Sequence, residues 1–154
     1  MVKQLADEIG DVKDKRLLDL YAGAGNFSIP LAIEARETVA VEENPASIAD
    51  GKRNASANRI TGYRFVPGTA EDAKLKGEFD VLIIDPPRSG LSKTALARVM
   101  DMAPPRLAYI SCNPSTMARD LKALVEKYAV DSIRVADMFP QTYHVECMGI
   151  LTKK

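Results

Sequence analysis

The stretch LLDLYAGAGNFS, residues 17–28, joins an apolar segment to a helical pattern through a glycine-rich turn. Gly23 and Gly25 allow a tight turn, and they let a ligand approach the backbone without a Cβ in the way. The third glycine of a dinucleotide fingerprint is absent, because Ser28 stands in its place. The turn predicts a cofactor loop, and a tight turn that binds no ligand is the alternative.

Outward from this turn, short apolar segments alternate with longer amphipathic ones. The apolar segments predict strands at 16–20, 38–42, 63–67, 79–85 and 107–111. The amphipathic segments predict helices at 2–9, 26–35, 45–58, 93–102 and 114–128. Alternation of this kind predicts a parallel sheet with helices on both faces.

The C-terminal end departs from this alternation. Segments 131–139 and 144–153 both have strand patterns, with no helical segment between them. Such a short connection cannot make a parallel crossover, so we expect an antiparallel pair. We therefore predict an α/β fold, a Rossmann-like sandwich of the class I methyltransferase type, with a mostly parallel sheet that ends in an antiparallel hairpin.

The composition suits one domain spanning residues 1–154. The N-terminus lacks the apolar core of a signal peptide, no apolar run could span a bilayer, and two cysteines make no disulfide framework. We expect a cytoplasmic protein that binds neither membrane nor metal. Lys+Arg and Asp+Glu both number 21, so the chain has no net charge. A protein that binds RNA by itself usually has a basic excess, so either the basic residues cluster on one face or another domain binds the RNA.

Two acids near the turn bear on the choice of cofactor. Asp19 lies near the end of the first strand, and Glu42 ends the second. A carboxylate in the position of Glu42 accepts hydrogen bonds from both ribose hydroxyls and repels a ribose phosphate, which argues against NADP. Glu43 is interpreted as a solvated neighbour. Because a pyrophosphate requires the third glycine, the turn favours S-adenosylmethionine over NAD.

The segment FDVLIIDPPRSG ends the fourth strand with Asp85, two prolines and Arg88. Ligands of open α/β sheets bind at the carboxyl ends of the strands, so Asp85 is expected in the same crevice as Gly23 and Glu42. Methyltransferases that act on exocyclic amines often have an aromatic residue after the two prolines. Arg88 stands there instead, which argues against amine methylation. A plain turn is the alternative.

The segment YISCNP places Cys112 at a strand end and a helix start. The positive end of a helix favours a thiolate, whereas a small buried cysteine is the alternative. Carbon 5 of uracil is a poor nucleophile, and a thiolate that adds to carbon 6 makes carbon 5 reactive enough to accept a methyl group. A base must then remove the proton from carbon 5. His144 and Glu146 lie two apart at the start of the last strand and share a face, so either is a candidate base, while Cys147 is expected in the core.

Together, the segments LDLYAGAGNFSIPLA, VAVEENP, FDVLIIDPPRSG, YISCNPSTMARDL and DMFPQTYHVECM resemble the RNA uracil-5 methyltransferases, which make 5-methyluridine in tRNA and rRNA. The resemblance covers the whole chain as a catalytic domain. It implies that Cys112 is the nucleophile and Glu146 the base, and that Arg88 lies near the substrate. The cofactor, S-adenosylmethionine, would contact Tyr21, Asn26, Glu42 and Asp85, with Gly23 shaping its loop.

Members of this family also have an upstream RNA-binding domain, and an upstream glutamine is expected to contact the cofactor. Neither is found in this chain. RNA cytosine-5 methyltransferases usually have a cysteine after the prolines of the DPP region, and none occurs here. The remaining alternatives are a methyltransferase on another RNA base or a small molecule, without covalent catalysis, and a binding module without activity.

Overall fold

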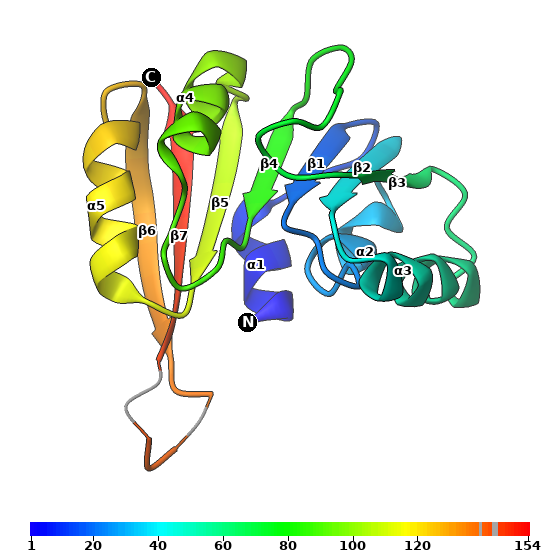
Figure 1. Ribbon diagram of the computed structural model, residues 1–154, viewed down its shortest axis with the longest axis horizontal. Helices are drawn as coiled ribbons and strands as arrows, with labels where there is room; N and C mark the ends of the chain where they lie inside the picture. Colours follow the sequence, from blue (N-terminus) through cyan, green and yellow to red (C-terminus); the bar gives the residue numbers. More distant parts are fainter. Residues whose placement is uncertain (139, 143–144) are drawn as a thin grey trace.

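The computed structural model describes residues 1–138, 140–142 and 145–154. Seven strands form one sheet in the order β3-β2-β1-β4-β5-β7-β6 (Figure 1). The strands are β1 (Arg16–Leu20), β2 (Glu37–Glu42), β3 (Tyr63–Pro67), β4 (Val81–Ile84), β5 (Arg106–Ser111), β6 (Tyr128–Ala136) and β7 (Glu146–Lys153). The helices are α1 (Val2–Ile9), α2 (Ser28–Ala32), α3 (Pro45–Ala57), α4 (Lys93–Met102) and α5 (Pro114–Leu124). The first five strands pair in parallel, and β7 is antiparallel to both β5 and β6.

The order of the strands reverses at β1, which pairs with β2 on one side and β4 on the other. At such a switch point the connections after the two central strands turn to opposite sides of the sheet and open a crevice at the carboxyl edge. The glycine-rich turn after β1 and the DPPR segment after β4 therefore flank the same crevice.

Two apolar clusters lie on the two faces of the sheet. One contains Leu18 of β1 and Val99 of α4 with the apolar residues of α5, and the other contains Leu17 of β1 and Leu5 of α1. Neighbouring residues of β1 thus face opposite layers of helices. Every residue of β4 is buried, which is why its sequence is apolar without alternation.

The structure confirms the predicted antiparallel end of the sheet and moves several boundaries. The helix predicted for 114–128 ends at Leu124, and Tyr128 instead begins β6, where it pairs with Lys153 of β7. The aromatic ring of Tyr128 suits either a helix face or a strand, and pairing with β7 decides the matter. The helix predicted from residue 26 begins at Ser28, and the strand predicted for 79–85 spans only 81–84.

No helix within the residues described is long and apolar enough to cross a membrane.

Candidate functional site

Four neighbouring parallel strands deliver predicted site residues to one edge of the sheet. Tyr21 follows β1, Glu42 ends β2, Asp85 follows β4 and Cys112 follows β5. Glu146 is the first residue of β7, which runs in the opposite direction, so it begins at the edge where β5 ends. The structure therefore brings together residues that are spread over most of the chain.

The glycine-rich turn is joined to the end of β2 through Glu42. The N–H of Gly23 donates to Glu42 Oε2 at 2.8 Å, and the N–H of Asn44 donates to Glu42 Oε1 at 2.8 Å. These bonds orient the carboxylate that was predicted to contact a ribose. Gly23 has a φ of +54°, and the space where its Cβ would stand is open. Asn26, the other predicted contact in this turn, is exposed.

Beneath the turn lies a buried polar group that includes Asp19. The hydroxyl of Ser28 donates to the Asp19 carboxylate and lies 2.7 Å from the hydroxyl of Tyr63. Burial raises the pKa of Asp19 to about 7, and the negative charges of Asp85 and Glu42 add to the increase. Sequence reasoning did not single out Tyr63, because its position in β3 carries no motif that links it to the turn.

Gly25 makes this arrangement possible. It has a φ of +80°, and a Cβ on it would lie 2.7 Å from the hydroxyl oxygen of Tyr63. A larger residue would therefore collide with the buried group as well as adopt a strained backbone. The two glycines have different roles: Gly25 allows close packing, whereas Gly23 faces open space.

Asp85 and Glu146 interact electrostatically across the site. Burial raises the pKa of Asp85 to about 6, and the negative charge of Glu146 contributes to the same increase. Cys147 is buried and packs in the apolar cluster under α5, which confirms its place in the core. His144 lies outside the described residues, so its predicted role stays a prediction.

Cys112 is partly exposed and lies just before α5. The side chain of Asn113 caps this helix by accepting a hydrogen bond from the N–H of Ser115 at 3.1 Å. The hydroxyl of Ser111 accepts a hydrogen bond from the N–H of Asn113 at 3.0 Å. Cys112 is thus held between two residues whose side chains bond the adjacent backbone, at the positive end of a helix. A thiol with this placement can reach a ligand, which a core cysteine cannot do.

A cavity of about 730 Å³ lies beside these strand ends, between the segments that follow β1, β2, β3 and β4. Tyr21 and Glu42 line it, and burial raises the pKa of Tyr21 to about 12. Gly23, Asn26, Asp85, Arg88 and Cys112 are not among its lining residues. The predicted site residues therefore fall into two groups: Tyr21 and Glu42 line the cavity, whereas Asp85 and Cys112 lie outside its lining.

Sequence reasoning missed several lining residues of the cavity. Glu71 lies in the connection after β3, and Arg119 and Asp120 come from the middle of α5. None belongs to a strand-end motif, although the pair RD stands within the segment YISCNPSTMARDL. The cavity is within the size range of sites for small ligands, and its wall holds both acidic and basic side chains.

Comparisons with known proteins place these features in a family. The family model of the tRNA (uracil-5-)-methyltransferases matches residues 71–154, and that of the methyltransferase small domain matches residues 1–109. The chain is 39% identical to an RNA methyltransferase of Caldanaerobacter subterraneus over 94% of this chain and 33% of the relative. It is 44% identical to an RNA methyltransferase of Synechocystis over 88% of this chain and 30% of the relative. The chain thus spans about a third of the length of these relatives.

Solved structures agree with the predicted fold. The tRNA (uracil-54, C5)-methyltransferase of Pyrococcus abyssi, in complex with S-adenosyl-L-homocysteine, superposes with a TM-score of 0.84 at 35% identity, over 98% of this chain and 38% of that one. TrmN of Thermus thermophilus has a TM-score of 0.80 at 20% identity over 99% of this chain and 48% of that one, and this likeness shows the fold alone. The fold is that of the class I methyltransferases. Because the first family model covers more than half of the chain, including Asp85, Cys112 and Glu146, this chain belongs to the tRNA (uracil-5-)-methyltransferase family.

Proposed function

We propose that this chain is the catalytic domain of an enzyme that transfers a methyl group from S-adenosylmethionine to carbon 5 of a uridine in tRNA or rRNA. The observation that carries the proposal is the meeting of Asp85, Cys112 and Glu146 at one edge of the sheet, beside the glycine-rich turn. The Pyrococcus abyssi enzyme supports it, because its name states this reaction and its structure holds the demethylated cofactor.

The residues present fit the proposed cofactor. The cavity beside Tyr21 and Glu42 has the size of a small-ligand site, and the turn at Gly23 is open to an approaching ligand. Glu42 would bind the ribose hydroxyls, and Tyr21, Asn26 and Asp85 would complete the contacts. S-adenosylmethionine supplies an electrophilic methyl group on a positively charged sulfur, and a carboxylate nearby stabilises that charge.

The chemistry on the RNA side would use Cys112 and Glu146. The Cys112 thiolate would add to carbon 6 of uracil, and the electrons would move to carbon 5, which would take the methyl group as the bond between that methyl and the sulfonium sulfur breaks. Glu146 removes the proton from carbon 5, and the carbon–sulfur bond breaks to release the thiolate and the product. Arg88 is exposed at this side, where it would lie near the substrate. The partial exposure of Cys112 supports this role over simple packing.

Two measurements test the proposal. Calorimetry with S-adenosylhomocysteine should show binding, and its absence even with the upstream segment restored would refute the cofactor assignment. RNA that contains 5-fluorouridine, incubated with S-adenosylmethionine, should form a stable adduct because fluorine cannot be removed as a proton. Mass spectrometry should place the adduct on Cys112, and Cys112→Ala should form none.

The outcome also distinguishes the alternatives. Methyl transfer retained by Cys112→Ala would favour a methyltransferase that acts on another base or a small molecule without covalent catalysis. Cofactor binding without any methyl transfer to RNA would favour a binding module. The cytoplasmic location and the upstream RNA-binding domain stay predictions.

A further inference from the structure

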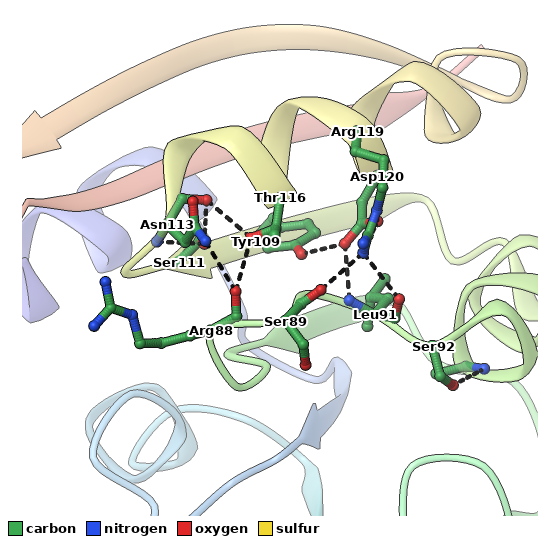
Figure 2. A network of polar contacts seen from close by, with 11 residues as sticks. Arg88, Ser89, Leu91, Ser92, Tyr109, Ser111, Asn113, Thr116, Arg119 and Asp120 are labelled. Carbon is green, nitrogen blue, oxygen red and sulfur yellow. Dashed lines mark hydrogen bonds and ion pairs between the residues drawn. The ribbon is translucent and has the colours of Figure 1, made fainter.

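The segment between β4 and α4 is bonded to α5 through its own backbone (Figure 2). We call residues 88–91 the 88–91 loop. At the start of α5, Asn113 Nδ2 donates to the carbonyl of Arg88 at 3.1 Å, and Thr116 Oγ1 donates to the same carbonyl at 3.2 Å. The carbonyl of Arg88 faces α5 while its side chain extends away from that helix (Figure 2). Asn113, which follows Cys112, thus bonds the backbone of Arg88, the residue predicted to lie near the substrate.

The middle of α5 holds the other end of the loop. A guanidinium nitrogen of Arg119 donates to the carbonyls of Ser89 at 3.0 Å and Leu91 at 3.1 Å. The N–H of Leu91 in turn donates to Asp120 Oδ2 at 2.8 Å. Four side chains at or in α5 therefore bond three residues of the loop, and every bond involves loop backbone rather than a loop side chain.

Asp120 connects this contact to the sheet. Its side chain is 1% exposed, and it forms an ion pair with Arg119 at 2.7 Å. The hydroxyl of Tyr109, in β5, donates to the same Oδ2 at 2.6 Å. A buried carboxylate is costly unless it is paired and hydrogen-bonded, and here its bonds join β5, α5 and the 88–91 loop.

Gly90 allows the loop to lie this close. It has a φ of +74°, and a Cβ on it would lie 2.6 Å from Asp120 Oδ2 and 2.7 Å from a guanidinium nitrogen of Arg119. Any side chain at this position would force the loop or the side chains of Asp120 and Arg119 to shift. The close approach thus depends on a glycine in the loop as well as on the polar side chains of the helix.

We propose that Asp120, together with Arg119 and Tyr109, positions the 88–91 loop relative to Cys112. These three are positioning residues, and the inference rests on the proposed function. Ser89, Gly90 and Leu91 line the cavity, while Cys112 lies at the N-terminus of the helix that holds them. Helix α5 thus sets the distance between the cofactor cavity and the nucleophile. A displacement of about 1 Å between reacting groups costs on the order of 100-fold in rate.

A pair of tyrosine variants tests this proposal. Tyr109→Phe removes the hydroxyl that donates to Asp120, and Tyr128→Phe removes a hydroxyl that donates to the carbonyl of Pro104 at 3.0 Å. Both tyrosines are fully buried, so the two changes are matched in chemistry and burial. We expect Tyr109→Phe to lower the rate of adduct formation with 5-fluorouridine RNA by about fivefold, through misplacement of reacting groups. Tyr128→Phe should stay within about twofold of the unchanged chain, because it is remote from the loop.

Variants of Asp120 add a rescue. Asp120→Asn keeps an oxygen that can accept from Leu91 and Tyr109, whereas Asp120→Ala removes it. We expect Asp120→Ala to weaken S-adenosylhomocysteine binding by about tenfold, because the loop lines the cavity, and Asp120→Asn to restore most of the affinity. Hydrogen exchange of the Leu91 amide should be faster in Asp120→Ala than in Asp120→Asn.

The outcomes separate the two levels of inference. Equal rates of adduct formation and equal hydrogen exchange of the Leu91 amide in Tyr109→Phe and Tyr128→Phe would overturn the positioning role. An Asp120→Asn variant that binds S-adenosylhomocysteine as weakly as Asp120→Ala would overturn it too. If Asp120→Ala does not fold, the tyrosine pair still decides. Failure to bind S-adenosylhomocysteine even with the upstream segment restored refutes the proposed function instead, while hydrogen exchange at the Leu91 amide still reports whether Asp120 holds the loop.

Discussion

We predict how replacement of the buried Asp19 with Asn changes the free energy of unfolding. The difference between the Asp19→Asn variant and the unchanged chain should shift in favour of the variant as the pH rises. Burial raises the pKa of Asp19 from its ordinary value of 3.8 to about 7. The folded chain therefore holds this proton over a pH range in which the unfolded chain has released it, so the unchanged chain loses stability as the pH rises through that range. Asn keeps the side-chain shape and an oxygen that can accept from Ser28, but it does not titrate.

The magnitude follows from the two pKa values. At 1.36 kcal/mol for each pKa unit, the full difference amounts to about 4 kcal/mol. About 3 kcal/mol of it develops between pH 5 and pH 8, because the unfolded carboxyl is already ionised at pH 5. The Asp19→Asn variant lacks this loss, so its free energy of unfolding should rise by about 3 kcal/mol relative to the unchanged chain between these two pH values.

Urea unfolding of both chains at pH 5, 6, 7 and 8, without ligand, measures this difference. Glu37→Gln is the control. The hydrogen bond from Arg16 lowers the pKa of Glu37 below its ordinary value of 4.5, so Glu37 is mostly ionised in both states throughout this range. Its effect on stability should therefore change little between pH 5 and pH 8. A constant difference between the Asp19→Asn variant and the unchanged chain would refute the reasoning, because it would mean that Asp19 ionises in the folded chain at its ordinary pKa.

The other predictions concern the cofactor. Burial and Glu146 raise the pKa of Asp85 to about 6, so affinity for the positively charged S-adenosylmethionine should increase as the pH rises through that value. In calorimetry, Glu146→Gln should move the midpoint of this pH dependence to lower pH. An unmoved midpoint contradicts the coupling between Asp85 and Glu146. Gly23→Ala should lower the free energy of unfolding by only about 1 kcal/mol, because alanine is strained at the positive φ of this residue. It should nevertheless weaken S-adenosylhomocysteine binding by at least about tenfold, because the added Cβ enters the space that a ligand approaches. Gly25→Ala should lower the free energy of unfolding by about 2–4 kcal/mol in urea, because its Cβ collides with Tyr63. Similar stabilities for the two glycine variants would argue against the different roles assigned to Gly23 and Gly25.

Local sequence was enough to locate most elements and the residues at strand ends. Periodicity and turn residues are local signals, so β1, β3 and α4 have the predicted bounds. The boundary between α5 and β6 was wrong, because an amphipathic helix and an edge strand both accept residues 125–128. Pairing with β7, which is distant in sequence, supplies the missing information.

The sequence by itself determined the chemistry available at the carboxyl edge: Gly23, Glu42, Asp85 and Cys112 each end or follow a strand, and parallel strands end on one side. Only the tertiary structure decided what surrounds them. It places Tyr63 against the glycine-rich turn and buries Asp120 between β5, α5 and the 88–91 loop. The physical reason is that burial, close approach and the resulting pKa values depend on contacts between segments far apart in the chain, and no local pattern encodes those contacts.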